Sequence, residues 1–135
     1  MRMPPRSHAD LLERPTFANL ATVRPDGAPQ VNVMWFAWDG ERIRMTHKRT
    51  RQKFRNIARD PRVALSIPDP DDQYRFLEVR GVVESIEDDD EKASFYQALQ
   101  ERYGRVYPIH DASDRVIVTI RPESYVAVVD GTVQK

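Results

Sequence analysis

The chain has 135 residues, of which 40% are apolar and 31% charged, a composition typical of a single soluble domain spanning 1–135. It contains no cysteine, which excludes disulfides, thiolate metal sites and cysteine nucleophiles. Its formal net charge is zero, whereas dedicated nucleic-acid-binding domains are usually basic, so we expect no nucleic-acid partner. No apolar run is long enough for a signal peptide or a membrane span, and a cytoplasmic location is therefore the default expectation.

Alternating and β-branched stretches predict six or seven antiparallel strands. They lie at 15–23, 30–38, 41–47, 62–67, 74–87 and 114–129, the last broken into two strands at Arg121-Pro122. Turn residues at 24–29 and an Asp-Gly pair at 39–40 join the first three into an expected three-stranded meander. Gly81 is expected to bend or bulge the long strand that contains it.

Two or three short helices are expected as well. They span Ser7–Leu12, Thr50–Arg59 and Asp88–Tyr103. Ser7 and Thr50 are the expected N-caps of the first two, and the acids that follow Asp88 suit the positive end of a helix dipole. The fold class is therefore mainly β (α+β), and closure into a small barrel is one way for a chain of this size to remove open sheet edges.

Charge is unevenly distributed along the neutral chain. Residues 42–62 include nine Lys or Arg and one acid, whereas 69–91 include ten acids and two bases. The densest basic segment is "THKRTRQKFRN" at 46–56. At the predicted helix start, backbone N–H groups and the side chains of Arg51 and Lys53 could bind one phosphate-sized anion. The alternative is a pair of oppositely charged, solvated faces.

Catalysis by the protein's own side chains has little support in the sequence. None of the three histidines has a partner at metal-ligand spacing, and no nucleophile motif, dinucleotide fingerprint or P-loop is present. We therefore predict no metal site and name no catalytic residue. His8 and His110 are expected to be exposed, whereas His47 ends a strand beside the basic segment and could contact an anion.

Both faces of the predicted strand at 30–38 carry large apolar side chains. Asn32, Met34 and Phe36 share one face, and Val31, Val33 and Trp35 share the other. One face has to enter the core, and the other could offer a flat surface to an aromatic ring system. Alternatively, the two faces are core and subunit interface.

The order of these motifs resembles a known family. Residues 17–70 carry "LATVRPDGAPQV", then a Trp and "DG", then the "T…R-x-K-x-R-N" turn, and then "DPRVAL". The segment resembles the flavin/deazaflavin oxidoreductases of the pyridoxamine-5′-phosphate-oxidase-like split β-barrel group, and is most similar to the branch that uses coenzyme F420. Weaker similarity continues through "VRGVVE" to "VIVTIRPESYVAV".

The resemblance implies a six- or seven-stranded split β-barrel that works as a homodimer, with two cofactor sites at the subunit interface. Arg51 and Lys53 would hold the cofactor phosphate, supported by Arg55 and Asn56. The strand from Gln30 through Asn32, Val33 and Met34 to Trp35 would lie along the ring system, with Gln30 and Asn32 hydrogen-bonding its polar edge. Thr46 and His47 would border the phosphate or the adjoining chain.

The implied chemistry is hydride transfer between F420 and an unsaturated small-molecule substrate, in which the cofactor carries the reactivity. FMN is the alternative cofactor, and a non-catalytic carrier of F420, flavin or haem is the alternative function. Pyridoxamine-phosphate oxidases proper have additional substrate-binding arginine and histidine residues near the C-terminus. The present chain ends in "VVDGTVQK", so we expect no oxidation of pyridoxamine phosphate.

Overall fold

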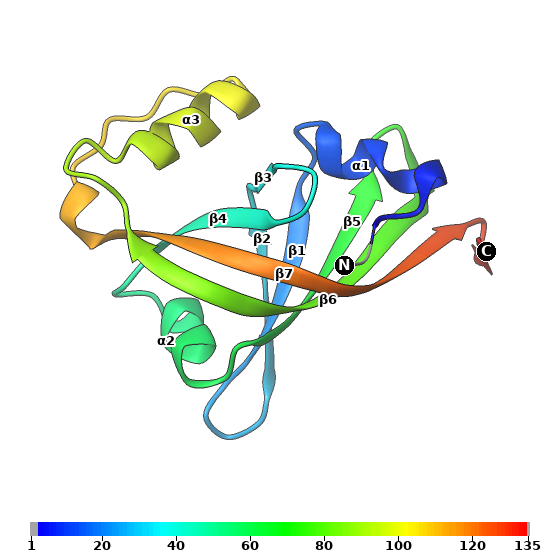
Figure 1. Cartoon of the computed structure of the whole chain (residues 1–135), viewed down its shortest axis with the longest axis horizontal. Coiled ribbons are helices and arrows are strands. Elements are labelled where there is room, and N and C mark those ends of the chain that lie inside the picture. Colours follow the sequence, from blue (N-terminus) through cyan, green and yellow to red (C-terminus); the bar gives the residue numbers. More distant parts are fainter. Residues whose placement is uncertain (1–2, 135) are drawn as a thin grey trace.

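A single antiparallel sheet organises the fold in a computed structural model that describes residues 3–134 (Figure 1). Its strands are β1 (Ala18–Val23), β2 (Pro29–Met34), β3 (Ala37–Trp38), β4 (Ile43–Lys48), β5 (Arg62–Asp69), β6 (Asp72–Asp88), β7 (Arg115–Val129) and β8 (Thr132–Val133). The helices are α1 (Asp10–Glu13), α2 (Gln52–Arg59) and α3 (Ser94–Tyr103), with short 3-10 turns η1 (Arg6–His8) and η2 (Ala112–Asp114). The predicted class, mainly β with few helices, is confirmed.

The strands pair in the order β2-β1-β5-β6-β7-β4-β3, and β8 pairs with β7. The predicted three-stranded meander is confirmed only in part. β1 pairs with β2, and β3 pairs with β4, but the expected middle strand is divided into β2 and β3, and β4 pairs along its whole length with β7. The two end strands of this order, β2 and β3, are consecutive in sequence and are separated only by Trp35 and Phe36. The sheet must therefore curl until its edges approach each other. We call residues 35–36 the seam.

The seam is not part of the sheet, because its backbone forms hydrogen bonds with α3 in place of a neighbouring strand. The hydroxyl of Tyr103 in α3 accepts a hydrogen bond from the Phe36 N–H at 3.0 Å, while the Phe36 side chain is completely buried. The same hydroxyl lies 2.6 Å from the carbonyl oxygen of Thr16, to which it donates. One side chain from α3 thus joins the seam to the segment before β1, which satisfies buried backbone groups that would otherwise need a strand partner.

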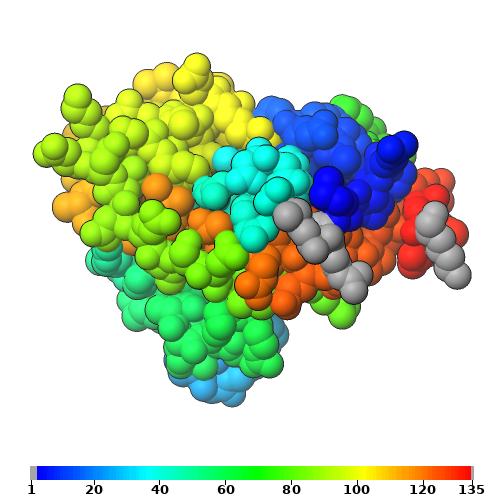
Figure 2. Space-filling view, viewed as in Figure 1, coloured from blue at the N-terminus to red at the C-terminus, as the bar shows by residue number. Residues whose placement is uncertain are grey.

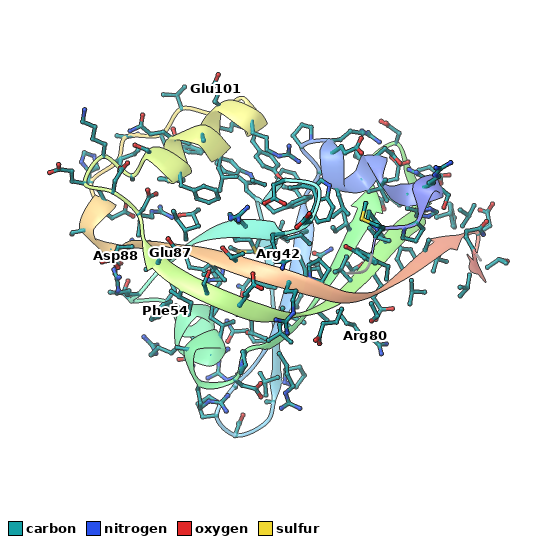
Figure 3. The ribbon with its side chains drawn as sticks, viewed as in Figure 1. Arg42, Phe54, Arg80, Glu87, Asp88 and Glu101 are labelled. Atoms are coloured by element: carbon teal, nitrogen blue, oxygen red, sulfur yellow. The ribbon has the colours of Figure 1, made fainter. Side chains whose placement is uncertain are left out.

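The two longest strands, β6 and β7, bend together at Gly81. The pairing register shifts between Arg80 and Gly81, which confirms the predicted irregularity there. The predicted break at Arg121-Pro122 is wrong, since β7 is continuous from Arg115 to Val129. Pro122 lies opposite Gly81, at the irregular point of the ladder, where its missing N–H is tolerated. Arg80 projects from the outside of β6 (Figure 3).

The helices begin later than their sequence patterns predict. Arg51, not Thr50, is the N-cap of α2, and the Thr50 hydroxyl instead donates to Asp114 at 2.8 Å. α3 begins at Ser94 and not at Asp88, because Asp89 accepts hydrogen bonds from backbone N–H groups in its first turn. The carboxylates before α3 therefore satisfy the helix N-terminus from outside the helix.

The expected N-terminal helix is a 3-10 turn followed by α1, and Ser7 does not cap it. His8, expected to be exposed, is completely buried, and its Nε2 lies 3.1 Å from the carbonyl oxygen of Val128. Its Nδ1 lies 2.8 Å from the Ser7 hydroxyl. The side chain is therefore part of the contact between the N-terminal segment and the end of β7.

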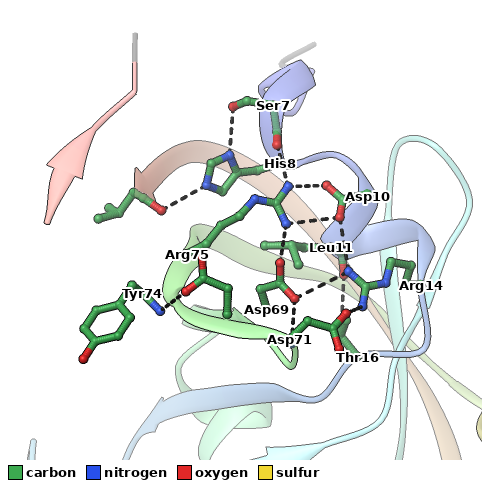
Figure 4. Close-up of polar contacts among 12 residues, drawn as sticks. Ser7, His8, Asp10, Leu11, Arg14, Thr16, Asp69, Asp71, Tyr74 and Arg75 are labelled. Carbon is green, nitrogen blue, oxygen red and sulfur yellow. Dashed lines mark hydrogen bonds and ion pairs between the residues drawn. The ribbon is translucent and has the colours of Figure 1, made fainter. Parts of the chain in front are cut away.

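An ion-pair cluster holds this N-terminal segment against the β5–β6 hairpin (Figure 4). Arg75 of β6 pairs with Asp69 of β5 at 2.8 Å and with Asp10 of α1 at 2.5 Å. Arg14 adds contacts to Asp10 at 3.3 Å and to Asp71 at 2.9 Å. Because Arg75 has one partner on each side, it joins two segments that are far apart in sequence.

The hydrophobic core lies within the curl of the sheet. Fully buried side chains come from α1 and from all the long strands except β2, including Leu11, Leu20, Met45, Leu77 and Val118. Phe54, labelled in Figure 3, packs on this core from α2. α3 is tied to the end of α1 by Arg102, which donates to the backbone oxygen of Arg14 at 2.7 Å. The two segments lie side by side in the space-filling view (Figure 2).

Candidate functional site

A cleft of about 280 Å³ opens beside the seam, where β2, β4, α2, α3 and the start of β7 come together. One part of its lining is apolar and aromatic: Val33, Met34, Trp35, Tyr96 and Tyr107. The other part is polar: Thr46, Lys53 and Arg115. The lining contains two cations and no acid. The arrangement fits a ligand with a planar ring at one end and an anionic group at the other.

Stacked rings position the aromatic side of the cleft. Trp35 lies nearly parallel to Tyr103, with 4.9 Å between ring centroids and 5° between planes. Phe17 also stacks on Tyr103, with 5.9 Å between ring centroids, and Tyr107 stacks on Trp35 at 6.1 Å. Since Tyr103 is fixed by its hydroxyl hydrogen bonds, the indole of Trp35 is held in one orientation.

Lys53 supplies an uncompensated charge on the polar side. Burial lowers the pKa of its ammonium group, and the nearby Arg51 and Arg115 lower it further. Within residues 3–134, it forms no ion pair with a carboxylate, unlike Lys48, which lies 3.1 Å from Asp111. A half-buried ammonium group surrounded by like charges is a position where a bound anion is stabilising.

His47 lies next to the cleft but on the other face of β4 from Thr46. It shares the core face with Met45 and is 1% exposed. Burial, with the charges of Lys53 and Arg115, lowers its pKa to about 3, so the ring is neutral at pH 7. Neither ring nitrogen has a hydrogen-bond partner among the described residues. Such a buried polar group calls for a water molecule or a ligand atom.

The amides of Gln30, Asn32 and Asn56 form a chain that braces α2 against β2. Asn56 is fully buried and donates to Gln30 at 3.1 Å and to the Thr22 hydroxyl at 3.0 Å, while Gln30 donates to Asn32 at 3.1 Å. Arg55 donates to the backbone oxygen of Thr50 at 3.0 Å, within its own turn. These four side chains do not line the cleft.

The structure thus brings together five of the residues predicted for a cofactor site: Val33, Met34, Trp35, Thr46 and Lys53. It leaves six outside the lining: Gln30, Asn32, His47, Arg51, Arg55 and Asn56. Sequence reasoning missed Tyr96, Tyr107 and Arg115. Only the pairing of β4 with β7, which sets Arg115 opposite Lys48, indicates that Arg115 belongs here, and that pairing is not visible in the sequence.

A larger hollow, of about 580 Å³, lies elsewhere, over β1, β5 and β6. Its two cations, Arg62 and Arg80, are already paired with Asp60 and Glu78 respectively. A bound anion would therefore be more stabilising in the smaller cleft, where Lys53 has no acidic partner among the described residues, and we place the candidate cofactor site there. No group of acids and histidines suited to a metal ion occurs in the described part of the chain. Nor does any described helix have the length and apolarity needed to cross a membrane.

The curled sheet, with its edges meeting at an aromatic seam, is a split β-barrel. Residues 5–128 match the family model described as pyridoxamine 5′-phosphate oxidase, and the chain belongs to this family. Its resemblance to the F420 branch is confirmed by the solved structure of an F420 reductase. The two are 54% identical, with 90% of this chain and 97% of the other covered and a TM-score of 0.86.

More distant solved structures share the fold. A conserved hypothetical protein from Mycobacterium tuberculosis is 29% identical, with 96% of this chain and 87% of the other covered and a TM-score of 0.74. HutZ, the haem storage protein from Vibrio cholerae, is 20% identical, with 98% and 100% covered and a TM-score of 0.70, a likeness that shows the fold alone. Among curated proteins, none matches the chain.

Proposed function

We propose that the protein is an F420-dependent oxidoreductase that transfers a hydride between the deazaflavin and an unsaturated small molecule. The observation that carries the proposal is Lys53, a half-buried cation with no acidic partner among the described residues, in a cleft whose other side is a fixed aromatic surface. The 54% identity to an F420 reductase supports F420 over FMN as the cofactor. The bound cofactor would supply the hydride chemistry.

The protein's part would be to bind and orient. Lys53 and Arg51 would bind the phosphate together with the first N–H groups of α2, and Thr46 would border it. Met34 and Trp35 would contact the ring system, with Val33 at the cleft edge.

The remaining predicted residues would act from around the cleft. Gln30 and Asn32, which lie outside the cleft lining, would hydrogen-bond the polar edge of the ring only if the ring extends past the cleft along β2, while Asn56 and Arg55 keep α2 in place. His47 would offer a neutral ring nitrogen, not a charge, behind the phosphate. We assign no catalytic side chain.

A second copy of the chain would complete the site. Phe17, Val31 and Val33 are 55%, 63% and 66% exposed, a concentration of apolar side chains just before β1 and on β2 that favours a protein contact. Because Val33 also lines the cleft, a partner on this face would reach the bound ring. Light scattering should give about twice 15.7 kDa, and Val31→Asp should lower this mass. A monomer with full cofactor affinity would contradict the shared site.

Cofactor titration tests the proposal. Trp35 lines the cleft, so F420 binding should quench tryptophan fluorescence, and FMN is the comparison ligand. Lys53→Ala should weaken binding about 10- to 150-fold, the equivalent of about 1.5–3 kcal/mol for a charged hydrogen bond. The matched control, Lys92→Ala, removes an exposed lysine from the turn before α3 and should leave affinity unchanged. If neither cofactor binds at micromolar concentration, the proposed function is wrong.

The alternative is a carrier that binds the cofactor without turning it over. The absence of any acid from the cleft lining is the observation that favours it, because binding alone explains every residue there. Reduced F420 should be oxidised by the protein when unsaturated acceptors are supplied. Tight F420 binding without oxidation by any acceptor would support the carrier.

A further inference from the structure

We propose that Arg115 is an anion-binding residue of the cleft, so that the phosphate of the bound cofactor lies between Lys53 on α2 and Arg115 on β7. This inference rests on the proposed function. It adds a cation from the C-terminal half of the chain to a cleft whose other lining cation, Lys53, lies in the first turn of α2.

Three neighbours hold the Arg115 guanidinium in place. Asp111 accepts from its Nε at 3.2 Å and contacts its Nη2 at 3.2 Å. The ring of Tyr96 in α3 lies under the guanidinium plane, 3.8 Å from the Cζ atom to the ring centroid. Nη1 lies 3.5 Å from the hydroxyl oxygen of Thr46, which also lines the cleft. The side chain is therefore oriented before any ligand binds, which lowers the entropic cost of binding.

Donor capacity remains after these contacts are made. Each terminal guanidinium nitrogen carries two hydrogens and makes one contact with the described residues, which leaves one N–H on each for a ligand. Arginine presents such donors in a plane that matches a phosphate or carboxylate edge. The side chain is 13% exposed, and an anion in the cleft would meet it in a partly desolvated environment.

Charge balance points the same way. Asp111 is shared between Arg115 and Lys48, while Lys53 forms no ion pair within residues 3–134. The four side chains together carry two uncompensated positive charges. Arg115 also contributes to the lowered pKa of Lys53, as expected for two like charges that line the same cleft. A doubly charged phosphate between them would convert that repulsion into two attractive contacts.

A purely architectural role for Arg115 makes a different prediction. If Asp111 and Tyr96 hold Arg115 only to fix the loop before β7, its replacement would lower stability without changing ligand affinity in the folded protein. Ligand affinity and stability therefore have to be measured on the same variants.

The experiment compares Arg115→Gln, Arg115→Lys and a control, Arg121→Gln, which removes an arginine from the same strand outside the cleft. F420, FMN and inorganic pyrophosphate serve as probes, measured by tryptophan quenching and by the ligand-induced rise in melting temperature. Arg115→Gln should weaken all three probes about 10-fold or more, and Arg115→Lys should restore part of the loss. Arg121→Gln should bind as the wild type does. Thermal melts without ligand identify the variants that fold. If Arg115→Gln does not fold, Arg115→Lys is compared with the wild type in its place.

The outcomes separate this inference from the proposed function. If the wild type binds FMN or pyrophosphate but not F420, and Arg115→Gln weakens that binding, the anion site stands and the F420 activity does not. The inference is overturned if folded Arg115 variants bind as tightly as the wild type, or if no phosphorylated probe binds the wild type.

Discussion

Replacing Tyr103 with Phe isolates the contribution of one hydroxyl group to the seam. The substitution keeps the ring and its stacking on Trp35 and Phe17 but removes the hydroxyl. That hydroxyl accepts from the Phe36 N–H at 3.0 Å and donates to the Thr16 oxygen at 2.6 Å. No other hydrogen bond reaches either group within the described residues.

The expected cost follows from the burial of these two groups. Phe36 is 0% exposed and Thr16 3%, and a buried polar group that loses its partner costs about 1–3 kcal/mol. Water can partly satisfy the two backbone groups, so their combined cost is less than the full sum of two such penalties. We therefore expect Tyr103→Phe to lose about 2–4 kcal/mol of unfolding free energy. For a chain of this length, that corresponds to a fall in melting temperature of about 6–20 °C.

Urea unfolding followed by circular dichroism measures this loss. Equal m-values for the variant and the wild type would show that both expose the same amount of surface on unfolding. The matched control is Tyr107→Phe, whose hydroxyl makes no hydrogen bond within residues 3–134 and whose side chain is 49% exposed. The control should stay within about 0.5 kcal/mol of the wild type. If Tyr103→Phe is equally harmless, the hydroxyl does not hold the seam and the account of Trp35 orientation fails.

Three further predictions test other parts of the structure. Gly81→Ala should lower the unfolding free energy by about 1–3 kcal/mol, because an added Cβ would lie 2.6 Å from the Arg121 backbone oxygen; stability equal to the wild type in urea would contradict that contact. The hydrogen bond from Arg75 lowers the pKa of the Asp10 carboxyl below 3.8. The folded protein should therefore lose unfolding free energy as the pH falls through this range, and Asp10→Asn should make that loss smaller between about pH 5 and 3. An equal loss in the variant would show that Asp10 does not cause it. Because the pKa of His47 is lowered to about 3, its ring resonances should not titrate in NMR spectra between about pH 8 and 5, and a midpoint near 6.5 would show that the ring is not buried.

Local patterns were sufficient for most individual elements. The helix α2 follows from the apolar spacing of Phe54 and Ile57, and the bend at Gly81 follows from a glycine in an alternating strand. These predictions succeed because the determining interactions lie within a few residues of each other. The order of motifs along 17–70 was specific enough to indicate the split barrel and its F420 branch.

The errors concern contacts between distant segments. His8 is buried against Val128, whose backbone oxygen lies within hydrogen-bond distance of its ring although the two residues are far apart in sequence. β4 pairs with β7 and not with β2. Arg115 was missed for the same reason, since only the fold brings it to the cleft beside Lys53. Asp89 and Asp90 were assigned to a helix that they cap from outside, because acidic residues are favoured both just before and just inside a helix start.

A crystal structure of the protein with F420 would show whether the cleft beside the seam holds the phosphate and ring of the cofactor. We expect the cofactor phosphate within about 3 Å of the Lys53 ammonium, with the deazaflavin ring against Trp35. Electron density for the cofactor in the larger hollow over β1, β5 and β6, with Lys53 free, would contradict it.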